Sequence, residues 1–121
     1  MKDNKFRQGH TLSGKMMLAG KNAEQNEKII GQVHENEIVL HTKVAGSPFV
    51  NIKGKASKDD IKDGAVFCAR YSQAWKKAKI KRDVEVHYFK GKDIFKEKDM
   101  KLGTFGVKKF KKIIVKKEEL Q

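Results

Sequence analysis

The hydrophobic and polar positions along the chain predict one long helix at residues 58–77. Apolar and small side chains recur there at helical spacing, at Ile61, Ala65, Cys68, Ser72 and Trp75. Ser57 stands where an N-cap is expected, and lysines close the segment at the negative end of the helix dipole. The small residues on this stripe indicate that the helix packs closely against a sheet.

The rest of the pattern predicts strands and one short helix. We expect strands at residues 4–10, 15–19, 37–42, 49–53, 84–88, 92–95 and 110–117, and a helix at residues 22–31 that ends at Gly31. Turns are expected at Ser13-Gly14 and at residues 45–48, and strand 92–95 is expected to pair with strand 84–88. Helices separated from hairpins indicate an α+β fold, with an antiparallel or mixed sheet packed on the long helix.

Length and composition indicate a single domain without a membrane span or a secretory signal, and they do not indicate a function. At 121 residues, one domain over residues 1–121 is the expectation. The longest apolar run has four residues, far below the about 18 that a membrane span needs, and no secretory signal follows Met1. Cys68 is the only cysteine, which points to a reducing, cytoplasmic setting.

The charge adds a candidate partner. The formal net charge is +13, and residues 50–121 carry +11 of it. Two lysine-rich runs stand out, at residues 76–82 and 108–117. Clustered lysines bind phosphates and release counterions, so they favour a nucleic-acid partner. A generally lysine-rich, solvated surface and an acidic protein partner are the alternatives.

The second run also has a structural interpretation. Alternation over residues 108–117 sends both lysines and apolar residues to each face, which predicts an edge strand. Lysines on an edge also prevent strand-to-strand aggregation. Aromatic residues are sparse here, so a base-stacking platform is not indicated, and lysine favours phosphate contact over base reading.

No catalytic, cofactor or metal site emerges from the remaining motifs. Residues 9–15 match G-x-x-x-x-G-K, but Met16 stands where a phosphate loop needs Ser or Thr, and no strand and helix flank the match. The four histidines and Cys68 lack metal-ligand spacing. We therefore expect neither an enzyme nor a small-molecule substrate.

Two segments together resemble a known family. Residues 20–27, G-K-N-A-E-Q-N-E, are similar to the G-R-N-A-x-Q-N-E stretch of the NFACT-R domain, and residues 37–47, E-I-V-L-H-T-K-V-A-G-S, resemble its D-I-W-L-H-x-R-x-x-x-G-S-H stretch. The resemblance continues to about residue 117. Val39 replaces a tryptophan of the pattern, Glu37 its aspartate, and Pro48 its final histidine.

The resemblance implies an RNA-binding domain of proteins that rescue stalled large ribosomal subunits. These 121 residues resemble none of the other domains of those proteins, so we expect a stand-alone form. It implies a non-catalytic module for ribosomal RNA or tRNA, and possible contact with the large subunit. A protein-interaction adaptor and a general DNA binder are the alternative functions.

The candidate RNA-binding residues fall into two groups. The motif residues are Lys21, Asn22, Asn26, His41, Lys43 and Ser47. The residues of the basic runs are Lys76, Lys77, Lys79, Lys81, Arg82, Lys108, Lys109, Lys111 and Lys112. Free backbone amides at a helix N-terminus beside Lys21 suit a phosphate. The alternative is structural: Asn22 is an N-cap, Asn26 fixes a loop and His41 is a satisfied core histidine.

Overall fold

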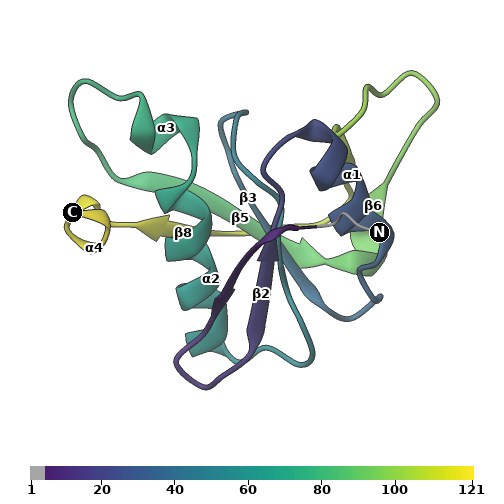
Figure 1. Ribbon diagram of the computed structural model, residues 1–121, viewed down its shortest axis with the longest axis horizontal. Helices are drawn as coiled ribbons and strands as arrows, with labels where there is room; N and C mark the ends of the chain where they lie inside the picture. The colour runs from purple at the N-terminus through teal and green to yellow at the C-terminus, as the bar shows by residue number, and fades with distance from the viewer. Residues whose placement is uncertain (1–4) are drawn as a thin grey trace.

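The computed structural model describes residues 5–121 as a six-stranded antiparallel sheet with helices on both faces (Figure 1). The strand order is β1-β2-β4-β3-β5-β8, so β1 and β8 are the edges. The strands are β1 (Arg7–His10), β2 (Met16–Ala19), β3 (Ile38–Thr42), β4 (Val50–Ile52), β5 (Val84–Lys90) and β8 (Lys111–Val115). This arrangement confirms the predicted α+β class and the edge position of the second basic run.

The helices flank this sheet, and a small hairpin extends from it. The helices are α1 (Ala23–Gly31), α2 (Lys58–Arg70), α3 (Gln73–Lys76), the 3-10 turn η1 (Gly91–Asp93) and α4 (Lys117–Leu120). Strands β6 (Ile94–Phe95) and β7 (Gly106–Val107) form a separate two-stranded sheet. No helix among residues 5–121 is long and apolar enough to cross a membrane.

Helix α2 seals one face of the sheet. Leu40, Ile52 and Val86 of three adjacent strands are fully buried there against its small residues. Gly64 of α2 lies so close to this layer that a Cβ atom would sit 2.9 Å from the Ile52 side chain. Cys68 is fully buried in the same layer, and burial raises the pKa of its thiol to about 12, so it is an inert core residue.

The N-terminus of α2 is fastened to the β1–β2 hairpin. Ser57 and Asp60 form a capping box, in which the Asp60 amide donates to Ser57 Oγ and the Ser57 amide donates to Asp60. Asp60 also accepts from Ser13, and Lys15 Nζ lies 3.3 Å from its carboxylate. Bonds from Ser57, Ser13 and Thr11 hold the pKa of Asp60 well below its usual range. Lys15, the lysine of the G-x-x-x-x-G-K match, therefore serves this contact within a hairpin.

The predicted long helix at 58–77 is divided in the structure. α2 ends at Arg70, and α3 begins after Ser72. The Ser72 hydroxyl donates to the Ala69 carbonyl and accepts from the Trp75 amide, so it closes one helix and caps the next. The apolar stripe continues through the break because Ser72 and Trp75 both stay buried. The periodicity was therefore a correct guide to burial and a wrong guide to helix continuity.

The predicted pairing of residues 92–95 with β5 is also wrong. After β5 the Gly91 amide donates to the Glu37 carbonyl at 3.0 Å, and the Lys92 amide donates to the Glu35 carbonyl at 2.9 Å. These bonds turn the chain away from the sheet, and β6 then pairs with β7 instead. The turn at residues 34–37, remote in sequence from Gly91, decides where this segment goes.

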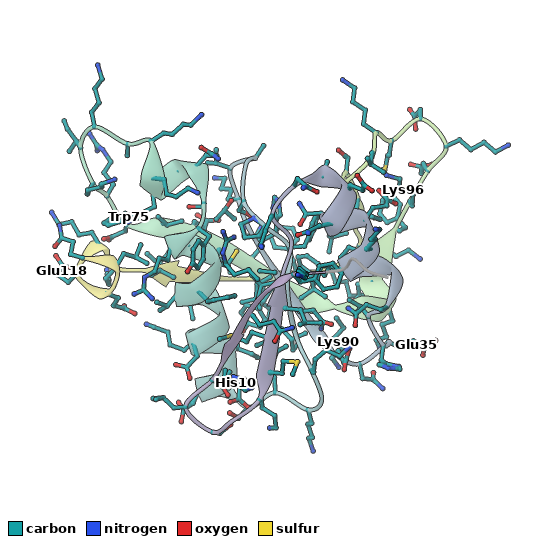
Figure 2. The ribbon with its side chains drawn as sticks, viewed as in Figure 1. His10, Glu35, Trp75, Lys90, Lys96 and Glu118 are labelled. Carbon is teal, nitrogen blue, oxygen red and sulfur yellow. The ribbon has the colours of Figure 1, made fainter. Side chains whose placement is uncertain are left out.

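The other face of the sheet is only half covered. Ile29 of α1 and residues of the β6–β7 hairpin pack on Val39, Phe49 and Phe89. Beyond them two projections rise, which we call the α3 arm (residues 72–83) and the hairpin arm (residues 94–107) (Figure 1). Trp75 marks the first and Lys96 the second in Figure 2. Farther along this face, at the edge strand β8, the apolar side chains of Phe110 and Ile114 stay exposed.

Candidate functional site

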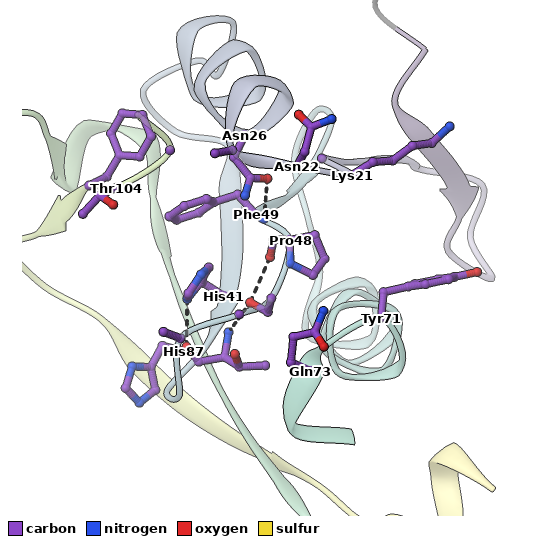
Figure 3. Close-up of a pocket in the computed structure, with 18 of the residues that line it drawn as sticks. Lys21, Asn22, Asn26, His41, Pro48, Phe49, Tyr71, Gln73, His87 and Thr104 are labelled. Carbon is purple, nitrogen blue, oxygen red and sulfur yellow. Dashed lines mark hydrogen bonds between the residues drawn. The ribbon is translucent and has the colours of Figure 1, made fainter. Parts of the chain in front are cut away.

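A groove of about 630 Å³ runs between the two arms (Figure 3). Its walls come from the β2–α1 turn, the β3–β4 loop, the segment joining α2 to α3, the middle of β5, and residues 102–110. In the close-up, Tyr71 lies to the right of Pro48, Gln73 lies below it, and His87 and Thr104 lie to its left. Segments from almost the whole chain thus meet at one place.

All six motif residues line this groove. They come from two segments about twenty residues apart: Lys21, Asn22, Asn26, His41, Lys43 and Ser47. The sheet brings the segments together because β2 and β3 both pair with β4. Residues that were grouped by resemblance are thus also grouped in space.

Asn22 and Asn26 hold the β2–α1 turn in place. Asn22 Oδ1 accepts from the Gln25 amide at 2.9 Å, as an N-cap does. Asn26 Oδ1 accepts from the Phe49 amide at 3.1 Å and so ties α1 to the start of β4. Gly20 permits this, because a Cβ atom there would overlap the Asn26 side chain. Both asparagines have the structural role that sequence analysis gave as the alternative to RNA binding.

The amides at the start of α1 are not all available. The Lys21 amide donates to the Gln25 side chain at 2.9 Å, and the Gln25 amide is bonded to Asn22. Sequence analysis predicted free backbone N–H groups at the start of α1. The structure corrects this prediction, because the N–H groups of Lys21 and Gln25 are already bonded within the turn. The exposed Lys21 side chain lies on the wall of the groove as a cation.

His41 and Ser47 shape the floor of the groove. His41 Nδ1 donates to the Thr42 carbonyl at 2.8 Å, and its ring lies 4.4 Å from the Phe49 ring. Burial lowers the pKa of His41 below 6.5, although the Thr42 carbonyl opposes this. Ser47 Oγ accepts from the Thr42 amide and donates to the Pro48 carbonyl, so it closes the β3–β4 loop.

The first basic run occupies the α3 arm, where only Lys76 lines the groove. Lys77, Lys79 and Arg82 are exposed on the arm. Lys81 lies back on the arm, with its Nζ bonded to the Trp75 carbonyl and 4.8 Å from the Trp75 ring centre. Lys81 is therefore engaged in packing.

The second basic run starts at the other end of the β5–β8 pair. Lys108, Lys109, Lys111 and Lys112 are exposed there. The α3 arm ends at Asp83, next to β5, and Val84 of β5 pairs with Val115 of β8. The arm therefore lies beside the C-terminal end of β8, where the Lys117 amide and Lys116 Nζ contact the Asp83 carboxylate. The two runs therefore meet only at Lys116 and Lys117. Apolar burial is confined to one face of β8, which differs from the expected mixture on both faces.

Sequence reasoning missed several residues of the groove. Arg7 lies 4.0 Å above the Tyr71 ring, and both line the wall nearest α2. The backbone of Gln73 is fixed there because its backbone N–H donates to the Gly46 carbonyl at 2.9 Å. His87 and Phe110 line the opposite part, with stacked rings 4.2 Å apart. No short-range pattern joins these residues, because each contact links segments that are remote in sequence.

The fold and the groove define an α+β domain with a lysine-bordered cleft beside a half-covered sheet. The family model described as NFACT protein RNA binding domain matches residues 5–109. The chain belongs to this family, and the resemblance seen in the two sequence motifs is confirmed.

One curated protein and one solved structure are similar to this chain. The archaeal Rqc2 homolog aRqcH of Methanocaldococcus jannaschii is 35% identical over 69 residues, which are 54% of this chain and 10% of the relative. The solved C-terminal part of the fibronectin/fibrinogen-binding protein from Streptococcus suis superposes with a TM-score of 0.83 at 24% identity, over 96% of this chain and 47% of that chain. This second likeness supports the fold. The chain thus spans a tenth of the archaeal relative and about half of the solved structure.

Proposed function

We propose that this chain binds RNA in the groove through contacts between lysines and phosphates, and that it catalyses no reaction. The main support is that the six motif residues all line one groove. The chain that contains this groove belongs to an RNA-binding domain family. The groove is wide enough for a nucleotide-sized segment, since ligand sites usually have volumes of about 300–1,000 Å³.

The charges around the groove support a phosphate partner. Lys21, Lys43 and Lys76 line it, in a chain whose formal net charge is +13. Each lysine supplies a compact positive charge that suits a phosphate without fixing the identity of a base. The asparagines and His41 give the groove its geometry and set how the backbone of the RNA runs through it.

The RNA we propose is ribosome-associated, either ribosomal RNA or tRNA. The support is the name of one relative, an Rqc2 homolog, together with the family match. A role in ribosome-associated quality control, with the large subunit as a possible docking partner, follows as part of the same proposal.

Salt dependence of binding tests the proposal. We would measure affinity for a labelled single-stranded RNA by fluorescence anisotropy at several salt concentrations. The triple change Lys21→Gln, Lys43→Gln and Lys76→Gln should weaken binding and reduce the slope of log affinity against log salt by about 2, at about 0.7 per lost contact. The matched control is Lys55→Gln, Lys58→Gln and Lys90→Gln, which removes the same charge from exposed positions that do not line the groove.

Equal losses in the two triple variants would mean that net charge alone drives binding and would contradict a groove site. A pull-down from lysate with and without ribonuclease tests the adaptor alternative. Partners of an RNA-binding module should be lost after nuclease treatment, whereas partners of a protein adaptor should remain. Binding of ribosomal subunits that survives the groove variant would also contradict the proposal.

A further inference from the structure

The half-covered face of the sheet carries a row of side chains at the groove. His41, His87 and Lys112 are direct partners across β3, β5 and β8, so they share the face opposite α2. Phe110 precedes β8 by one residue and lies on this same face, because side chains two apart in a strand point the same way. Neither α1 nor the hairpin arm buries Phe110, which is 54% exposed.

Phe110 is held in a defined orientation although it is exposed. Its ring stacks on the His87 ring, with centres 4.2 Å apart and planes inclined by 18°. His87 is fixed from behind, since its Nε2 lies 2.8 Å from a carboxylate oxygen of Glu85. One side of the Phe110 ring is therefore covered by an imidazole, and the residue lines the groove with about half of its surface exposed.

Two lysines lie near this ring pair, together with the Glu85 carboxylate. Lys112 stands in register with His87, and Lys43 and Lys112 are both near enough to lower the pKa of Glu85 by their charge. The neighbouring wall is apolar, since Phe105, Val107 and the exposed Leu102 line the same groove. A flat apolar group that is linked to a phosphate fits both features.

We propose that Phe110, supported by His87, is a stacking site for one unpaired nucleobase of the bound RNA. The base lies on the outer side of the Phe110 ring, and the flanking phosphates lie near Lys43 and Lys112. Stacking on an aromatic ring accepts any base and needs a base that is free of its helix. This inference rests on the proposed RNA-binding function and adds that the groove prefers unpaired over paired RNA.

The test compares three RNA probes of matched length at one salt concentration. The first is an adenine oligonucleotide, the second has the same sugar-phosphate chain with abasic residues at its centre, and the third is a blunt duplex. Phe110→Leu removes the ring and keeps an apolar side chain at an exposed position. It should weaken binding of the adenine strand about 5- to 150-fold, the range expected for one stacked base, and leave the other two affinities unchanged.

Two further variants complete the design. Leu12→Ala changes a side chain that is 98% exposed on the β1–β2 turn and should alter none of the affinities. Phe110→Trp should keep the binding of the adenine strand, and its added fluorescence should be quenched by that strand and not by the abasic centre. Melting temperatures of all variants should equal that of the unaltered chain.

Three outcomes overturn the proposal. Unchanged adenine binding in Phe110→Leu would remove the stacking site while leaving the groove lysines as RNA ligands. An equal loss for all three probes would assign Phe110 a role in the fold or in phosphate contact. Failure of the unaltered chain to bind any probe would overturn the proposed function itself, and the stacking site with it.

Discussion

The two faces of the six-stranded sheet are built from the same strands but are covered very differently. On the α2 face, Leu40 and Val86 are fully buried and the small residues of α2 allow the helix to lie close to the strands. On the opposite face, α1 and the hairpin arm bury Val39 and Phe89 and then stop. The next position along β3, on that same face, is His41, and its neighbour across β5 is His87.

Because the faces differ, alternate residues of one strand contribute to different properties: those on the α2 face to stability, and those on the opposite face to the proposed binding. In β3, Leu40 points into the sealed core while Val39 and His41 point to the half-covered face. The sealed face provides most of the buried apolar area and therefore most of the stability. The half-covered face can keep exposed rings and lysines because stability does not depend on them. Stability and binding should therefore respond to different substitutions.

The largest expected effect is on the sealed face. Leu40→Ala leaves a cavity beneath α2 and should lower the free energy of unfolding by about 2–5 kcal/mol. Urea denaturation followed by circular dichroism measures this loss. Phe110→Ala is the partner experiment on the half-covered face and should lower the same free energy by less than about 1.5 kcal/mol, since it removes one stacked ring pair. Similar losses in both variants would remove the distinction between the faces.

A smaller effect is expected at the wall of the groove. Gly20→Ala places a Cβ atom 2.9 Å from the backbone nitrogen of Asn26 and against its side chain, so the bond that the Phe49 amide donates to Asn26 Oδ1 must shift. The free energy of unfolding should fall by about 1–3 kcal/mol, as for other overpacked sites. Gly31→Ala is the control, because no atom lies within 4 Å of a Cβ there and the change favours the helix. Equal effects of the two changes would show that the turn is not constrained by packing.

The smallest effect concerns pH. Burial lowers the pKa of His41 below 6.5, so the unfolded chain takes up a proton first as the pH falls. Stability is therefore highest above pH 6.5 and decreases from there down to the lower pKa of the folded state. Glu27, Glu37 and Glu85 have pKa values lowered from 4.5, so their contribution is lost only in more acidic solution.

His41→Gln should flatten the part of the stability profile between pH 6.5 and 4.5. Thermal melts of both proteins across this range measure the change. The variant also loses the ring contact with Phe49, which lowers stability at every pH and leaves the shape of the profile to report the titration. Parallel profiles for the two proteins would assign the pH dependence to another group.

Local sequence signals predicted much of the fold and part of the site. The N-caps Asn22 and Ser57, the hairpin at Ser13-Gly14 and the edge strand at the second basic run were all found, because each depends on residues a few positions apart. The motif residues of the groove were named through a resemblance to a family. Their meeting in space could not be deduced from spacing alone.

The amino-acid sequence by itself determined the α+β class, the positions of the main elements, the excess of positive charge and the membership of an RNA-binding domain family. The tertiary structure decided the break at Ser72, the departure of β6 from the sheet and the pairing of Phe110 with His87. The physical reason is the distance along the chain over which each interaction acts. Caps, turns and periodicity act within one or two turns of chain, whereas the groove arises where β3, β5, the α3 arm and the hairpin arm meet through contacts between distant residues.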